Sequence, residues 1–192
     1  MSFDSAKYGE EVAAILALDG SGERLMPLSG GRCSSRAASA HLTRTTAREL
    51  FGRSRAPEAA LSGLWLYFSC LDESHSMSQA IHTPDGSFWH GIMHRQEPDP
   101  TNSGYWFRRV GGHPVFPKLA EEAARLTLET SNAGAVGEPL SRPRVSSTWD
   151  PFAFIDFCEQ ARRHPGSVEE TLALRIQRAE WQILFDYCAS PA

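Results

Sequence analysis

The strongest constraint on the fold is a segment that is apolar around almost the whole circumference of a helix. Residues 57–71 begin with Pro57, which suits the first turn of a helix. The large apolar side chains that follow cover one face and then most of the other: Leu61, Leu64, Trp65, Phe68, Leu66, Tyr67 and Cys70. A helix of this kind has to lie in the middle of a core, so other helices must surround it.

The rest of the chain shows helical periodicity and no convincing pair of alternating strands. Residues 37–51 predict an Ala-rich helix, and residues 168–188, opened by a capping box at Ser167, predict the longest one. Residues 131–148 are rich in Ser, Gly and Pro and predict a long surface loop. We therefore expect one all-α domain over residues 1–192, with about seven helices and irregular loops.

Composition excludes some classes of function. The formal net charge is −4 and only two lysines occur, so a nucleic-acid partner is not expected. The sequence shows no signal peptide and no apolar run long enough for a membrane span, which predicts a cytoplasmic protein. Four cysteines form no CxxC motif, and Cys70, Cys158 and Cys188 lie in apolar helical patterns that predict buried free thiols.

The sequence FWHGIMHRQE carries the main candidate site. On a helix over residues 87–97, at about 100° per residue, Phe88 and its apolar neighbours form one arc facing the core. His90, His94 and Glu97 fall at about 200°, 240° and 180° when Phe88 is taken as zero. These three side chains therefore share one narrow stripe beside the buried arc, as the wall of a cleft would.

Two histidines at i and i+4 can bind one metal ion, and Glu97 can complete the set. Zinc, iron or manganese would suit these ligands, although the pattern is not the HExxH motif. Without a metal, His90 and His94 could act as general acid and base, assisted by Glu97 or Glu73. A third interpretation is that the histidines are structural and bond only to other protein groups.

Further polar residues could line the same cleft. Arg95, Arg108 and Arg109 could clamp an anion, and Tyr105, Asn102 and His113 could contact a small ligand. The sequence leaves open which of several other donors converge with the pair: Asp72, Glu73, His75, His82 and His113. Glu180 lies in the buried half of the last helix and needs a partner, for which Arg108 or Arg109 is expected.

Residues 88–116 also carry a resemblance. The motif HGIMHRQEPD followed by NSGYWFRR resembles that of a family of uncharacterised bacterial proteins, with similar segments in fungal proteins. Flanking pieces such as SGLWLYFSCLDESH and WDPFAFIDFCE are similar too, so the resemblance covers most of the chain except residues 37–57 and 117–148. It implies that the chain belongs with these proteins, but it implies no substrate, cofactor or catalytic residue.

Two functions of different classes follow. The first is a cleft lined by His, Glu and Arg that binds a small anionic ligand, with metal-assisted hydrolysis as the chemistry. The second is a non-catalytic, homodimeric scaffold or interaction protein in which apolar helices form the dimer interface and the histidines are structural. Bound metal separates the two, because only the first requires His90 and His94 as ligands.

Overall fold

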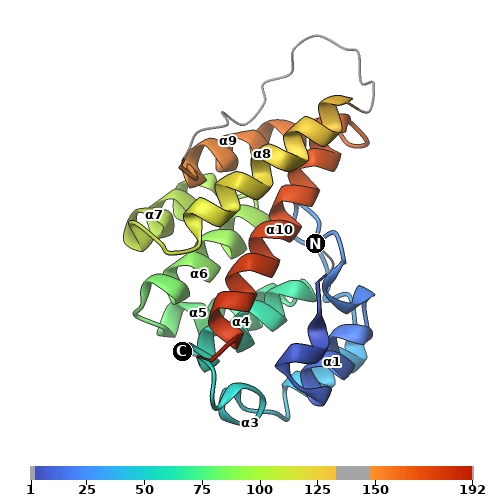
Figure 1. The fold of residues 1–192 in the computed structure, drawn as a ribbon, viewed down its shortest axis with the longest axis vertical. Coiled ribbons are helices and arrows are strands. Elements are labelled where there is room, and N and C mark those ends of the chain that lie inside the picture. Colours follow the sequence, from blue (N-terminus) through green and yellow to red (C-terminus); the bar gives the residue numbers. More distant parts are fainter. Residues whose placement is uncertain (1–2, 133–147, 192) are drawn as a thin grey trace.

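The computed structural model describes residues 3–132 and 148–191, which contain ten α-helices, two short 3-10 helices and no β-strand (Figure 1). The α-helices are α1 Glu10–Ala17, α2 Arg36–Leu42, α3 Ala47–Phe51, α4 Pro57–Tyr67, α5 Leu71–Ala80, α6 Pro84–Gln96, α7 Pro100–Val110, α8 Phe116–Asn132, α9 Pro151–Ala161 and α10 Val168–Ala189. The predicted all-α class is confirmed, and the number of helices is higher than the expected seven.

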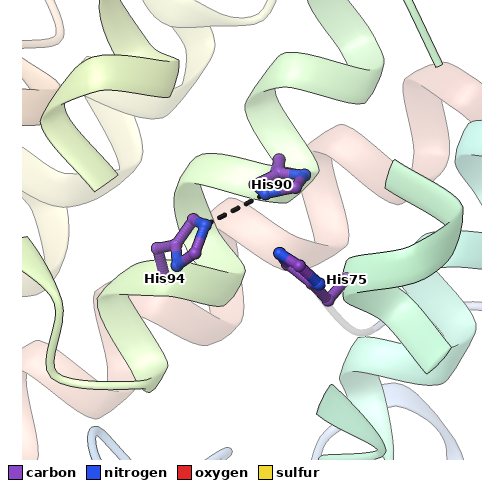
Figure 2. Close-up of side chains that lie close together, drawn as sticks. All are labelled: His75, His90 and His94. Carbon is purple, nitrogen blue, oxygen red and sulfur yellow. Dashed lines mark hydrogen bonds between the residues drawn. The ribbon is translucent and has the colours of Figure 1, made fainter. Parts of the chain in front are cut away.

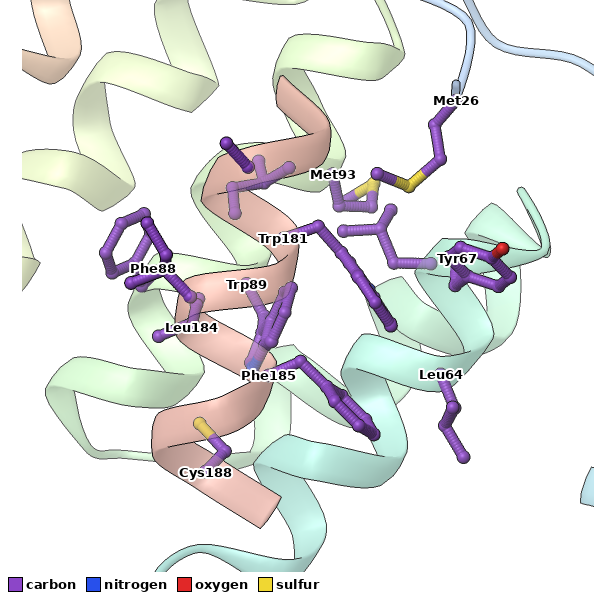
Figure 3. Packing of buried hydrophobic residues seen from close by; sticks show 14 of the residues in the cluster. Met26, Leu64, Tyr67, Phe88, Trp89, Met93, Trp181, Leu184, Phe185 and Cys188 are labelled. Atoms are coloured by element: carbon purple, nitrogen blue, oxygen red, sulfur yellow. The ribbon is translucent and has the colours of Figure 1, made fainter. Parts of the chain in front are cut away.

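Helix α4 lies in the centre, as its sequence predicts. Every residue from Ala59 to Tyr67 is buried. The long helix α10, which runs through much of the molecule, packs against α4 (Figure 1). Trp89 of α6 and Trp181 of α10 meet at Gly63 of α4 (Figure 3). The Trp181 indole donates to the Gly63 carbonyl at 2.7 Å, and a Cβ at Gly63 would lie 2.7 Å from the Trp89 ring. Glycine is needed here because a side chain would collide with the Trp89 indole.

The helix that carries the HGIMH motif, α6, packs closely against α7. A Cβ at Gly91 of α6 would lie 2.8 Å from the ring of Phe107, so the two helices approach closely at this glycine. Ser103 of α7 donates its hydroxyl to the Gly91 carbonyl at 2.7 Å. The Gly in HGIMH is thus a packing residue, and it aligns α7 along the histidine helix.

Several boundaries differ from the sequence prediction. The expected helix 37–51 is two helices, α2 and α3, because Thr46 caps a new helix with Glu49 in a capping box. Helix α6 begins at Pro84 with Thr83 as its N-cap, earlier than the expected start at residue 87. The predicted loop 131–148 lies mostly outside the described residues.

Helix α5 is the element that the sequence analysis missed. Its sequence, LDESHSMSQA, has few apolar residues and a low helix propensity at its serines, so its periodicity is weak. Packing against α4 and α6 stabilises it instead. Ser74 and Ser62, both buried, exchange hydroxyl-to-carbonyl hydrogen bonds of 3.1 and 3.2 Å between α5 and α4.

The cysteines are only partly as predicted. Cys158 and Cys188 are buried free thiols, which confirms the prediction for these two. The prediction for Cys70 is wrong, because this residue forms a disulfide with Cys33. Cys70 lies just outside α4, at the turn into α5, where the irregular segment 23–35 reaches it. Separately, none of the helices in the described ranges combines the length and the apolar character that a bilayer crossing requires.

Candidate functional site

Three histidines from two helices form the centre of the site. His90 and His94 lie one turn apart on α6, and His75 projects towards them from α5 (Figure 2). One ring nitrogen of each histidine lies within 4.8 Å of a ring nitrogen of the other two. The ring centroid of His75 is 4.7 Å from that of His90 and 5.4 Å from that of His94. The side chains that a metal ion would need are therefore already assembled.

The α6 pair is held from outside by two further side chains. The Nε2 atoms of His90 and His94 face each other at 3.0 Å (Figure 2). The Nδ1 atom of His90 lies 3.0 Å from the hydroxyl of Ser78, which is on α5. The Nδ1 atom of His94 lies 3.0 Å from a carboxylate oxygen of Glu97. Both rings thus turn their Nε2 atoms inward while their Nδ1 atoms are fixed by neighbours.

Glu97 has a different place from the one predicted for a third metal ligand. Its carboxylate holds the outer nitrogen of His94, and the side chain is 37% exposed. It therefore does not point to the inner nitrogens where an ion would sit. His75 takes the third position instead, and Glu97 lies behind His94 as the residue that orients it.

The site is more enclosed than the predicted cleft wall. His90 is 1% exposed and His94 is 7% exposed, whereas His75 is only half-buried. The indole of Trp106, on α7, stacks on the ring of His90 with centroids 4.0 Å apart. Trp106 is also only partly buried. The least buried side chains at the site are therefore His75 and Trp106, because the two α6 rings are covered by their surroundings.

Burial keeps the two inner histidines neutral. Desolvation, with smaller contributions from His94 and His75, lowers the pKa of His90 to about 3. Desolvation also lowers the pKa of His94, against the opposing effect of Glu97. Neutral imidazoles are the form that binds metal ions, so protons do not compete for these nitrogens at neutral pH.

The hydrogen-bond partners restrict where the imidazole protons lie. The Glu97 carboxylate can only accept, so His94 carries its proton on Nδ1 and leaves a lone pair on Nε2. Ser78 has one hydroxyl proton, and its shorter contact is to the Ser74 carbonyl, at 2.7 Å against 3.0 Å to His90. When the Ser78 hydroxyl donates to the Ser74 carbonyl, His90 donates from Nδ1 to the Ser78 oxygen, and its Nε2 also carries a lone pair. Two lone pairs then face each other at 3.0 Å with no proton between them.

The opposite proton arrangement gives a closed chain of hydrogen bonds. If Ser78 donates to His90 Nδ1, then His90 Nε2 donates to His94 Nε2, and His94 Nδ1 donates to Glu97. This arrangement satisfies every ring nitrogen of the pair without an ion. It corresponds to the structural interpretation of the histidines, and it differs from the first arrangement in two protons: the Ser78 hydroxyl turns from Ser74 to His90, and the His90 proton lies on Nε2 instead of Nδ1.

Arg95 does not reach this site. It lies on another face of α6, fully buried, and forms an ion pair with Glu180 of α10. Its guanidinium is also 3.4 Å from the Gln177 side chain and lies over the ring of Phe154. Glu180 has an arginine partner as expected, but the expectation of Arg108 or Arg109 is wrong. A sealed ion pair leaves Arg95 no access to a ligand from solvent.

The remaining α7 candidates divide between two sides of the helix. Arg109 is exposed and lies over Trp106, with its Cζ 5.3 Å from that ring centroid, and over Tyr105 at 5.9 Å. Arg108 instead lines a hollow of about 200 Å³ between α7 and α9, together with Phe152 and Asp156. The Asn102 side chain bonds to Asp99 at 2.7 Å and forms part of the α7 cap. Of these candidates, Arg109 and Tyr105 adjoin the indole that covers His90.

The other predicted donors lie away from the cluster. His113 is buried at the opposite end of α6, where it pairs with Asp85 at 3.0 Å. Glu73 and Asp72 are exposed on α5, and Glu73 is two residues before His75, which places it about 200° round the helix. His82 is exposed beyond the end of α5. Only His75, from this open set, joins the α6 pair.

Sequence reasoning left His75 among several donors that could converge with the pair, did not place Trp106 against His90, and missed Ser78 behind His90. His75 and Ser78 share one face of α5, at i and i+3, a signal that requires α5 to be recognised as a helix. Comparisons of the chain with models of protein families, with curated proteins and with solved structures find no match. The function is therefore argued from the site itself.

Proposed function

We propose that His75, His90 and His94 bind one divalent transition-metal ion, with zinc as the first choice, and that the protein carries out metal-assisted hydrolysis of a small anionic substrate. The observation that carries the proposal is the pair of inward Nε2 atoms at 3.0 Å, backed by Ser78 and Glu97. Buried lone pairs that face each other repel unless a cation lies between them.

The separation of the donors suits a tetrahedral ion. Two nitrogens at about 2.0–2.1 Å from one zinc ion are about 3.3 Å apart, which is close to the 3.0 Å between the α6 pair. His75 supplies the third ring nitrogen, which lies within 4.8 Å of a ring nitrogen of each of the other two. Metal-binding histidines commonly donate their second nitrogen to a carboxylate or another acceptor, as His94 does to Glu97.

Three protein ligands leave one position for water or substrate. A divalent ion with such an open position supplies Lewis acidity and lowers the pKa of bound water, which is the chemistry of hydrolytic metal sites. Glu97 orients His94 and supplies negative charge that favours a cation. Arg109, held over Trp106, places a positive charge beside the cover of His90, which supports an anionic substrate.

We keep a cytoplasmic location as part of this proposal. The rival function is the non-catalytic scaffold with structural histidines, and it corresponds to the closed chain of hydrogen bonds from Ser78 to Glu97. That chain of hydrogen bonds is the support for the scaffold function. The absence of bound metal in the test below would favour it.

Metal binding is tested first by equilibrium dialysis of the purified protein against zinc, cobalt, manganese and iron(II), followed by elemental analysis. We expect one ion per chain, lost in His90→Ala, His94→Ala and His75→Ala. His82→Ala removes an exposed histidine just beyond α5 and is the matched control, which keeps its ion. A wild-type protein that retains no ion at neutral pH favours the scaffold instead. Hydrolysis of chromogenic phosphate and carboxylate esters by the loaded protein then tests the reaction class.

A further inference from the structure

The disulfide between Cys33 and Cys70 lies at the start of the helix that carries His75. Cys70 directly precedes α5, and its carbonyl accepts from the Ser74 amide at 3.1 Å, which is the first turn of that helix. His75 follows in the same turn and reaches the α6 pair from this side. The position of His75 therefore depends on how the beginning of α5 is held.

Cys33 belongs to the irregular segment 23–35, which is fixed at its other end to the helices around the site. The Arg162 guanidinium donates to the Arg95 carbonyl, at 2.7 Å, and to the Leu28 carbonyl, at 2.8 Å. The Gln177 side chain of α10 donates to the Met26 carbonyl at 2.8 Å. The segment thus joins the end of α6, one residue after His94, to α10. The disulfide adds a covalent link from this unit to α5.

The other contacts at this junction are non-covalent. The Arg24 guanidinium, from the same segment, donates to the Tyr67 carbonyl and, at 3.0 Å, to the Ser69 hydroxyl. The Ser34 amide donates to the Phe68 carbonyl at 2.7 Å, next to the disulfide. Ser69 adopts a positive φ of 57°, which is an unfavourable conformation for a residue other than glycine, and without the disulfide this turn is held by hydrogen bonds alone. The Ser62–Ser74 hydrogen bonds still hold the body of α5 on α4. Opening the disulfide should therefore shift the start of α5 without unfolding it.

We infer that Cys33 and Cys70 are a redox-active pair that sets the affinity of the three-histidine site, so that the oxidised protein holds its metal ion and the reduced protein releases it. This inference rests on the proposed function. It extends that function by a regulatory input, because two ligands lie on α6 and the third lies on the helix that the disulfide fixes.

The reductant is a dithiol. One of its thiolates attacks the sulfur of Cys33, which is half-buried, while Cys70 is only 3% exposed. The Cys33–Cys70 bond breaks, the Cys70 sulfur leaves as a thiolate and takes up a proton, and a mixed disulfide remains on Cys33. The second thiol of the reductant then displaces Cys33 as a thiol and becomes a cyclic disulfide, so two electrons pass to the protein. Disulfides in a reducing cytoplasm are usually transient or redox-sensing, which agrees with the location proposed above.

The test compares zinc affinity in three samples by competition with a chromogenic chelator: oxidised wild type, wild type reduced with a phosphine, and the Cys33→Ser/Cys70→Ser variant. The variant has no thiols at this position that could bind zinc themselves, and it retains Cys158 and Cys188. We expect zinc to bind at least about tenfold more weakly to the reduced protein and to the variant than to the oxidised protein. Far-ultraviolet circular dichroism should stay the same in all three samples.

Equal zinc affinity in the three samples overturns the redox inference and leaves the metal site standing. Loss of zinc together with loss of helical signal also overturns it, because the disulfide then only stabilises the fold. An oxidised wild type that binds no zinc overturns the metal site, and the redox inference with it.

Discussion

Two neighbouring residues of α6, His94 and Arg95, enter two buried polar clusters of opposite character. On one face Arg95 meets Glu180, both fully buried, and the opposite charges satisfy each other. On the other face His94 meets His90, and two neutral rings turn their inner nitrogens towards each other. The first cluster balances its charges within the protein, although Arg95 Nε has no hydrogen-bond partner, whereas the second brings together two neutral rings with no charge of opposite sign between them.

The comparison shows why burial alone does not identify a site. A buried charge with a buried partner of opposite sign indicates a structural ion pair, even for an arginine such as Arg95 that the sequence suggests as a ligand-binding residue. Buried neutral imidazoles that converge, with outer nitrogens held by Ser78 and Glu97, are the arrangement on which the proposed metal site rests. Four experiments test this contrast, with the largest expected effect first.

Glu180→Ala should have the largest effect, on stability alone. Removing one partner leaves the Arg95 charge buried without compensation, which costs about 3–5 kcal/mol in the free energy of unfolding. The double variant Arg95→Met/Glu180→Leu replaces both charges by apolar side chains and should recover most of this loss. Urea denaturation measures both. A Glu180→Ala protein as stable as wild type would show that the pair has no structural role.

His90→Ala should have its main effect in the presence of zinc. At a free zinc concentration of about 100 times Kd, binding stabilises the wild type by about 2.7 kcal/mol, and the variant should lose this gain. Thermal unfolding with and without zinc measures it, with His82→Ala as the control that keeps the gain. If zinc stabilises His90→Ala and wild type equally, the ion binds elsewhere.

Glu97→Gln tests the residue behind His94 with little change in shape. The neutral amide orients the imidazole less strongly than the carboxylate, so zinc affinity should fall by about tenfold while the stability of the metal-free protein barely changes. Competition with a chelator measures the affinity. Glu73→Gln, an exposed carboxyl on α5, is the matched control and should bind zinc as the wild type does.

The pH dependence of the metal-free protein tests the burial of His90 directly. Burial lowers the pKa of His90 to about 3, below the ordinary value of 6.5. Between these two pH values the unfolded chain binds a proton at this histidine, whereas the folded protein does not. Stability is complete above about pH 6.5 and falls as the pH drops from there towards 3. Urea midpoints at pH 7 and pH 5 should differ less in His90→Gln than in wild type. An identical difference in both proteins would contradict a buried neutral His90.

The sequence predicted the parts of the site that depend on one helix. His90, His94 and Glu97 do share one stripe of α6, because their spacing alone sets their directions. The sequence could not place His75, whose helix has a weak pattern and is held by packing on α4. It also assigned Arg95 to a ligand, since a single helix does not reveal which face meets Glu180 of α10.

The amino-acid sequence by itself determined the all-α class, the central place of α4 and the stripe of two imidazoles and a carboxylate, because helical periodicity and capping act over a few neighbouring residues. Only the tertiary structure decided that His75 completes the cluster, that Arg95 is sealed in an ion pair and that Cys70 is bonded to Cys33. These outcomes join residues far apart in the chain, and their partners are set by helix packing rather than by local spacing.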